Sequence, residues 1–453
     1  MTNPVQSFYF PPGTTALPRI ERADGPYLWD TDGRRYLDAA SGPVVTNIGH
    51  GNARVIEAMK RQLDACAFAS RTAFVSDANA ELAEKLAALC GPGLDACFPT
   101  AGGSEAIETC LKFARQVAVT RGEAGRWKVL ARNPSYHGST LGALSVTGDD
   151  EAEAVFGPMM APMPKFPAPF TYRVPDGETA ETWPGRTLDI LEERILSEGP
   201  QACLAVIVEP VGGLATGALV SDGTYYRRLR ALCDHYGLFL IFDEIMSGAG
   251  RTGRFLAADH WSDARPDIVG LAKGLSAGYA PLGAMMASRS MVEEVAASGG
   301  FLHGHTYVAN PLSCAAGVAV LDETRRLGLI ENASRMGDAL RDSLERVAAA
   351  SPIVGNVRGK GLLMAIELVA DKASKALFPL DVDITRRLGQ AAMQNGLIVY
   401  ARRTSRGVFG EWVMICPPLT IDETVLGELE TRLADTLSAV VSDLHSDGHL
   451  RAA

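Results

Sequence analysis

Residues 267–284 read DIVGLAKGLSAGYAPLGA and combine a short apolar run with a lysine, Lys273, that small residues enclose. The run Ile268–Ala272 is apolar on successive residues, which is typical of a strand covered on both faces. A lysine delivered by such a strand into a pocket of Gly, Ala and Ser is poorly solvated, so its pKa falls and its amine becomes nucleophilic. The commoner alternative is a strand-end lysine that extends to solvent. The stretch therefore predicts a buried strand and makes Lys273 a candidate Schiff-base lysine.

Further apolar runs precede and follow this one, and helical patterns alternate with them between residues 80 and 330. This alternation predicts βαβ units around a largely parallel sheet, an α/β core. The expected strands are Trp127–Ala131, Cys203–Val208, Leu238–Phe242, Ile268–Ala272 and Ala284–Ala287. The Pro- and Gly-rich residues 157–185 are expected to form an irregular excursion from the core.

The flanking segments have a different pattern. A turn signal at residues 30–33 (DTDG) and a helix over 53–66 are expected near the start, and another helix begins near Pro311. Later strands are expected at 362–368, 397–400 and 412–415, between helices. We therefore predict an N-terminal segment (1–65), a large α/β domain (66–330) and a C-terminal α+β domain (331–453), with the first joining the third in a smaller lobe.

Composition limits the function classes. The chain of 453 residues is 47% hydrophobic and 21% charged, with a net charge of −10, which suits a globular enzyme and argues against nucleic-acid binding. The opening MTNPVQSFYFPPGTT has neither a basic nor an apolar signal region, and no run of eighteen apolar residues occurs, so we expect a cytoplasmic protein without a membrane partner. No CxxC or HExxH motif is present, and His445 and His449 stand alone in a polar tail, so no metal is expected.

Side chains that could bind a ligand or take part in catalysis follow several of the expected strands. Asp243 ends one run, Glu209 ends another, and the turn at residues 134–138 (PSYHG) follows a third. Open parallel sheets bind ligands beyond the carboxyl ends of their strands. A buried carboxylate at Asp243 needs a positive partner such as a pyridinium nitrogen, and Tyr136 could stack on a flat ring. A helix N-cap and a core tyrosine are the simpler alternatives.

Residues 100–104 (TAGGS) lead into a helical pattern over 105–119. A Gly- and Ser-rich turn that opens a helix presents free N–H groups and a positive dipole end to an anion. This pattern indicates either a phosphate site or an ordinary N-cap.

One motif points to a different cofactor. Gly248, Gly250 and Gly253 match G-x-G-x-x-G, which would indicate a nicotinamide-dependent oxidoreductase. However, five residues separate the motif from the preceding strand, and residues 254–266 do not form a clean helical pattern. No acidic residue ends a second strand at the distance that ribose binding needs. We therefore predict a tight turn and keep the oxidoreductase as a distant alternative.

In combination these segments resemble the class III (ω) pyridoxal-phosphate aminotransferases of fold type I, from about Gly25 to about Leu419. The motifs occur in the family's order: AGGSEAIETCLKFAR, YHGST, VEPVGG, FDEIMSGAGRTGRF, LAKGLSAGYAPLGA and HGHTYVANPLSCAAG. The resemblance implies a mostly parallel sheet flanked by helices, a smaller α+β lobe, and pyridoxal 5′-phosphate as cofactor. It also implies a homodimer with shared active sites, or a dimer of dimers.

The resemblance also assigns roles. Lys273 would form the Schiff base and Asp243 would meet the pyridine nitrogen, while Thr306 would reach the cofactor phosphate of the neighbouring subunit. The other implied cofactor contacts are Gly103 and Ser104 at the phosphate, Tyr136 and Ile245 on the two ring faces, and His137 and Glu209 near the ring. The role of Glu209 stays open between the cofactor, an arginine and the substrate amine.

Departures from the family pattern concern the substrate. The expected donor is an ω-amino acid or a primary amine, and the expected acceptor is a 2-oxo acid such as pyruvate. Met246 replaces a glutamine that is frequent in aminobutyrate and ornithine enzymes, and Val44 stands where amine:pyruvate enzymes often have an aromatic residue. An aminomutase or a dialkylglycine decarboxylase would use the same cofactor residues and remains an alternative.

Many members place an arginine for the substrate carboxylate directly after a GLxxR-like strand. Here Tyr400 occupies that position, and Arg402, Arg403 and Arg406 follow in a longer loop. Arg402 is the candidate carboxylate contact, against the alternative that all three arginines are solvated.

Overall fold

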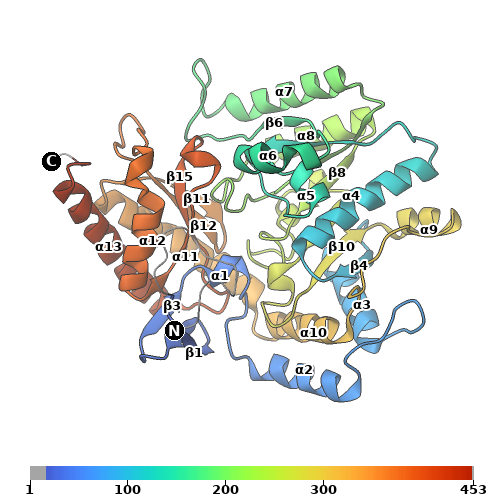
Figure 1. Cartoon of the computed structure of the whole chain (residues 1–453), viewed down its shortest axis with the longest axis horizontal. Helices are drawn as coiled ribbons and strands as arrows, with labels where there is room; N and C mark the ends of the chain where they lie inside the picture. Colours follow the sequence, from blue (N-terminus) through green and yellow to red (C-terminus); the bar gives the residue numbers. More distant parts are fainter. Residues whose placement is uncertain (1–16, 451–453) are drawn as a thin grey trace.

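The computed structural model describes residues 17–450 and is built around a seven-stranded sheet in the order β4-β10-β9-β8-β7-β5-β6 (Figure 1). In that order the strands are Ala96–Thr100, Gly283–Ala287, Ile268–Leu271, Phe239–Asp243, Cys203–Val208, Lys128–Asn133 and Lys165–Pro167. Strands β9, β8, β7, β5 and β6 are parallel, whereas β10 runs antiparallel to both β4 and β9. The predicted α/β class with a mostly parallel sheet is confirmed.

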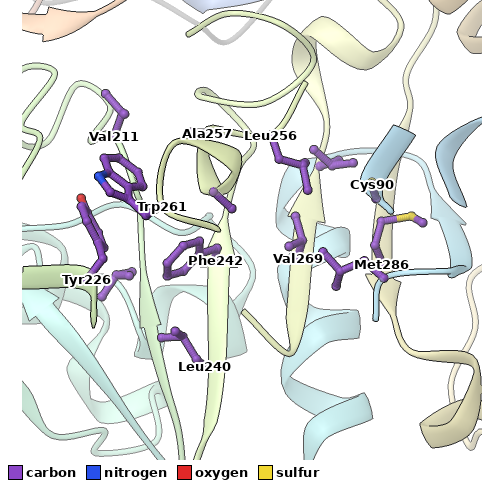
Figure 2. Packing of buried hydrophobic residues seen from close by; sticks show 14 of the residues in the cluster. Cys90, Val211, Tyr226, Leu240, Phe242, Leu256, Ala257, Trp261, Val269 and Met286 are labelled. Atoms are coloured by element: carbon purple, nitrogen blue, oxygen red, sulfur yellow. The ribbon is translucent and has the colours of Figure 1, made fainter. Parts of the chain in front are cut away.

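Residues of the central strands alternate between two hydrophobic clusters, which explains why the sequence runs are apolar without interruption. Leu240 and Phe242 of β8 belong to one cluster with Val269, as Figure 2 shows, while Ile241 and Ile268 belong to the other. Helices α3, α7 and α8 (Asp77–Cys90, Trp183–Glu198, Gly223–Tyr236) contribute to the first cluster, and α4 and α9 (Gly103–Thr120, Arg289–Ala297) to the second. Both faces of the sheet are therefore covered.

A smaller lobe contains two further sheets, β1-β2-β3-β13 and β11-β12-β15-β14. Their strands are Ile20–Asp24, Tyr27–Asp30, Arg35–Asp38 and Leu397–Ile398 in the first sheet, and Val354–Lys360, Leu363–Leu368, Glu411–Ile415 and Tyr400–Ala401 in the second. Helices α11, α12 and α13 (Leu329–Ala350, Ile384–Gln394, Glu423–Ser446) pack with them around a third hydrophobic cluster. Because β13 pairs in parallel with β3, the N- and C-terminal segments share a sheet, as predicted, and they lie together in Figure 1.

The structure corrects some predicted elements. The single strand predicted over 397–400 is wrong, because β13 and β14 belong to different sheets and the chain crosses between them at Val399. The short strand β6 lies inside the stretch 157–185 that was predicted to be irregular, and the strands β1, β2, β3, β4 and β11 were not predicted. The domain limits at residues 65 and 330 stay a prediction.

The remaining elements connect these layers. The helices are α1 (Ser41–Val44), α2 (Ala53–Ala65), α5 (Leu141–Ser145), α6 (Asp150–Phe156) and α10 (Pro311–Arg326). The short 3-10 turns are η2 (Gly157–Met159), η3 (Ala257–His260), η4 (Ser262–Ala264), η5 (Lys273–Leu275), η6 (Leu380–Val382) and η7 (Ser405–Gly407). The prediction that the opening segment, residues 1–15, is not a secretory signal concerns residues outside the described part of the chain.

Two kinds of feature are absent from residues 17–450. Of the helices there, none combines the length and the apolar character that a membrane crossing needs. Nor does that part of the chain contain a group of three or more His, Cys, Asp or Glu side chains placed to hold a metal ion.

Candidate active site

The carboxyl ends of β5, β7, β8 and β9 open onto one cavity of about 440 Å³, within the usual size range of small-molecule sites. Lys273, Asp243, Glu209 and Tyr136 line it, and so does the start of α4. Residues that are widely separated in the sequence are thus brought together at the sheet edge where parallel folds bind ligands.

Lys273 is separated from the end of β9 by one residue, Ala272, and begins the turn η5. Its φ of +46° is in the left-handed region, which a non-glycine residue rarely adopts and which often marks a functional position. Burial lowers the pKa of its amine, although the carboxylates of Asp243 and Glu209 act in the opposite direction. The shift follows the direction that the sequence predicts, and it makes the neutral, nucleophilic form of the amine easier to reach than in a solvated lysine.

Asp243 is the last residue of β8, and only 4% of it is exposed. Its Oδ2 accepts a hydrogen bond of 2.8 Å from Nδ1 of His137, and its Oδ1 accepts one of 3.0 Å from the backbone N–H of Ile245. His137 is fixed in turn, since its backbone N–H donates to Oγ1 of Thr147 at 2.9 Å. The carboxylate is therefore held rigidly at the wall of the cavity.

Glu209 follows β7 and forms hydrogen bonds with two neighbouring segments. Its Oε1 accepts a hydrogen bond from the N–H of Gly213 at 2.8 Å, and its Oε2 accepts a longer one of 3.5 Å from the N–H of Tyr136. Burial raises the pKa of this carboxyl, and nearby Asp243 adds to the shift. The neighbouring Glu244 points elsewhere: it accepts bonds from the N–H groups of residues 257 and 258, and burial raises its pKa to about 7.

The start of α4 forms the other end of the cavity. The first N–H groups of a helix have no intrahelical acceptors and can bind an anion. Oγ of Ser104 accepts a hydrogen bond of 3.0 Å from the N–H of Ser139. A Cβ atom on Gly138 would lie 2.8 Å from that Oγ, and one on Gly103 would lie 3.0 Å from Cδ1 of Ile245. The close contact and a φ of +137° require glycine at position 138, whereas a side chain at Gly103 would press against Ile245.

These features fit pyridoxal 5′-phosphate. The cavity offers an anion-binding helix start at Gly103 and Ser104, a fixed buried carboxylate at Asp243 and a lysine of lowered pKa, all among its lining residues. Tyr136 and Ile245 also line it and provide aromatic and aliphatic surfaces for a flat ring.

A second cavity of about 250 Å³ adjoins the first, since both are lined by Lys273, Glu209, Tyr136 and Met246. Tyr400 and Arg402 contribute to its wall, as do Leu214 and Ala215, which the sequence did not single out. The latter two lie in an irregular loop without periodicity, and only their position after the motif VEPVGG could have indicated them.

The three candidate arginines differ in their partners. Nε of Arg403 donates to Oε1 of Glu411 at 2.8 Å, and Nε of Arg406 lies 3.3 Å from Oε1 of Glu151. Arg402 lines the second cavity and has no ion-pair partner within residues 17–450. Arg402 is therefore the arginine that is available to a ligand.

Two candidate residues lie outside both cavities. Val44 is buried in the hydrophobic core, and its neighbours Pro43 and Val45 line the cavities instead. A backbone φ of +62° at Val44 turns this segment in a way that sequence spacing does not reveal. Thr306 is exposed and lines neither cavity of its own chain.

The glycines of the G-x-G-x-x-G match form the predicted tight turn, with φ of +90° at Gly250 and +84° at Gly253. A Cβ atom on Gly250 would lie 3.0 Å from Ile330, and the adjacent Arg251 is buried with its Nη2 donating to Oδ1 of Asn47 at 2.6 Å. The turn packs against the smaller lobe and lines neither cavity, so it offers no dinucleotide site.

The chain is similar to known proteins along nearly its whole length. Residues 9–437 match the family model described as aminotransferase class-III. The uncharacterized aminotransferase YodT of Bacillus subtilis (strain 168) is 39% identical over 436 residues, which cover 96% of this chain and 98% of that protein.

Two solved structures are similar along nearly their whole length. A thermostable (S)-enantioselective ω-transaminase from Thermomicrobium roseum is 36% identical with a TM-score of 0.88, covering 94% of this chain and 93% of that one. An amine transaminase from an uncultivated Pseudomonas species, solved in a PLP-bound form, is 34% identical with a TM-score of 0.89, covering 96% and 98%. The chain therefore belongs to the class III aminotransferase family and is a pyridoxal-phosphate-dependent transaminase of fold type I.

Proposed function

We propose that this transaminase moves an amino group from an ω-amino acid or a primary amine to a 2-oxo acid such as pyruvate, with Lys273 as its catalytic residue. The observation that carries the proposal is that Lys273 lines both cavities. One cavity contains the features that suit the cofactor, and the other contains Arg402, a cation available to a substrate carboxylate. The amine of a donor bound in the second cavity would lie beside the lysine.

The cofactor would be held by residues of the first cavity. The N–H groups of Gly103 and Ser104 would bind the phosphate, and Asp243 would meet the ring nitrogen, oriented by its hydrogen bond with His137. Tyr136 and Ile245 would cover the ring faces. When bound, pyridoxal phosphate supplies the electron sink for the electrons released as the substrate C–H bond breaks.

Side chains of the protein carry out the transfer of the substrate proton. Because burial lowers the pKa of Lys273, its Nζ is available as a base to remove the proton from the substrate carbon that bears nitrogen. The same Nζ would then hold that proton and act as the acid that gives it up. The carboxylate of Asp243 would stabilise a positive charge on the ring nitrogen of the cofactor.

A donor panel tests this substrate class. The holoenzyme is incubated with ω-amino acids and primary amines against pyruvate, 2-oxoglutarate and glyoxylate, and the products are identified. We expect the carbonyl form of a donor together with the aminated acceptor, alanine in the case of pyruvate. Release of carbon dioxide, an isomerised donor, or turnover of α-amino acids alone would contradict the proposal.

The free guanidinium of Arg402 makes a prediction about carboxylate donors. Changing Arg402→Ala should raise the KM of an ω-amino acid roughly tenfold, because a charged hydrogen bond is lost, and should leave the KM of an uncharged amine unchanged. Steady-state kinetics with the two donors measures the difference.

Arg406→Ala is the matched control, since Arg406 is on the same loop but lines neither cavity. Equal KM changes for both donors in Arg402→Ala, or a similar effect in Arg406→Ala, would show that Arg402 does not bind the donor carboxylate.

We also propose a homodimer, or a dimer of dimers, in which Thr306 reaches the cofactor phosphate of the neighbouring subunit. The exposure of Thr306 away from its own cavity supports this arrangement, as do the exposed apolar residues beside it, Leu302 (87% exposed) and Tyr307 (62%). We also propose a cytoplasmic location, which the eight free cysteines support because disulfides are rare in a reducing compartment.

A further inference from the structure

Residues 213–218, here called the wall loop, lie between β7 and α8 and have no regular structure, yet all of them are buried. Leu214 and Ala215 form part of the wall of the second cavity. The N–H of Gly213 donates to Oε1 of Glu209, which lines both cavities. The position of the wall loop therefore affects the shape of the second cavity and the position of the Glu209 carboxylate.

Two side chains of the smaller lobe hold the backbone of the wall loop. Nε1 of Trp412 donates to the carbonyl oxygen of Leu214 at 2.5 Å. Arg358 donates from Nε to the carbonyl oxygen of Gly217 at 2.6 Å and from Nη2 to that of Thr216 at 3.3 Å. These bonds satisfy three buried carbonyl groups of a loop that cannot satisfy them through a helix or a sheet.

The wall loop also packs directly on these two side chains. A Cβ atom on Gly217 would lie 2.5 Å from Cγ of Trp412 and 2.6 Å from Nη2 of Arg358. Gly217 has a φ of +59°, so both the left-handed backbone and the close approach require glycine there. The contact leaves no space for the loop to move toward the smaller lobe.

Arg358 and Trp412 are themselves fixed. The guanidinium of Arg358 lies 5.1 Å from the ring centre of Trp412 and forms an ion pair with the carboxylate of Glu367. Nε of Arg173 donates to the same carboxylate at 2.8 Å. Glu367 and Trp412 are each 1% exposed and sit opposite each other on β12 and β15. A buried carboxylate that two guanidinium groups share in this way is held rigidly.

The sheet that carries this network also carries another part of the wall of the second cavity. Strand β14 pairs with β15, with Tyr400 opposite Met414, and Arg402 follows β14 immediately. One side of the cavity is thus attached to the sheet β11-β12-β15-β14 through the backbone, and the wall loop is attached to it through Arg358 and Trp412.

We propose that Arg358 and Trp412 are positioning residues that hold the wall loop at a set distance from Arg402 and so determine the length of the donor. The proposal rests on the proposed function in one respect, since it takes the second cavity as the donor site. It predicts that weakening the hydrogen bonds of Arg358 or Trp412 to the wall loop changes which donors are accepted and does not change cofactor binding.

Hydrogen–deuterium exchange on the holoenzyme tests the hold on the wall loop. Trp412→Phe and Arg358→Lys should speed exchange of the amides of residues 213–218 and leave those at the start of α4 unchanged. Arg126→Lys is the matched control, because Arg126 also binds three backbone carbonyl groups, those of Pro200, Cys203 and Tyr236, but lines neither cavity. Wild-type exchange of the wall loop in both variants would overturn the proposal, whichever amine is the donor.

Kinetics tests the consequence for the donor. In Trp412→Phe and Arg358→Lys the KM of the best donor should rise roughly tenfold while kcat and the cofactor absorption stay close to wild type. Discrimination against a donor one methylene longer should also fall, whereas Arg126→Lys should keep both values. An unchanged KM and unchanged discrimination, despite faster exchange of the wall loop, would overturn the role in donor selection. If no amine of the donor panel were turned over, the proposed function would fail, and the exchange experiment would still decide whether the loop is held.

Discussion

Replacing Lys273 with alanine should lower the rate of amino transfer by roughly a thousandfold or more, because one side chain supplies both the attachment of the cofactor and the proton transfer. Lys273 lines both cavities, as a residue between cofactor and donor would. Burial lowers the pKa of its amine, which lies near Asp243. Single-turnover kinetics with the best donor, followed by cofactor absorbance, measures the loss.

Lys165→Ala is an informative control for that variant. Burial lowers the pKa of Lys165 to about 8, but this lysine lies on the edge strand β6 and lines neither cavity. It should therefore keep both activity and colour. Full transamination by Lys273→Ala with any donor would contradict the assigned role.

The variant Asp243→Asn should lower kcat about a hundredfold or more, since an amide cannot stabilise a positive charge on the ring nitrogen as a carboxylate does. The amide oxygen can still accept the bond from the N–H of Ile245, so the fold around β8 should persist. The predicted loss is therefore in the chemical step, with a changed cofactor spectrum and a similar unfolding midpoint.

Glu244→Gln separates the charge of Asp243 from the general effect of removing a buried carboxylate. Glu244 is equally buried and adjacent in sequence, but it binds the N–H groups of residues 257 and 258 and lines neither cavity. We expect a change of stability with an unchanged cofactor spectrum. A normal kcat in Asp243→Asn would show that this carboxylate does not support the ring nitrogen.

Much of the fold could be predicted because the central strands are covered on both faces. A strand such as Cys203–Val208 is apolar at every position, and its observed bounds are the predicted ones. Short strands at the edges or between lobes carry no such signal. Strand β6 has three residues, and the sequence around Val399 gives no sign that the chain changes sheets there.

The cofactor-site candidates could be found because they follow strands, and strand ends converge at one edge of a parallel sheet. The donor site could not be derived in the same way. Arg402 differs from Arg403 in its partners and from Arg406 in lining the second cavity, and the local sequence shows neither difference. The bond between Trp412 and Leu214 joins residues 198 positions apart, and nothing in the local sequence of either residue indicates it.

The most direct test of the central claim is to locate the cofactor on the chain. The holoenzyme is reduced with borohydride, digested, and the peptides are sequenced by mass spectrometry. We predict a yellow protein that bleaches on reduction and carries one pyridoxyl group, on the amine of Lys273. A pyridoxyl group on a different lysine, or none on the chain, would contradict the account.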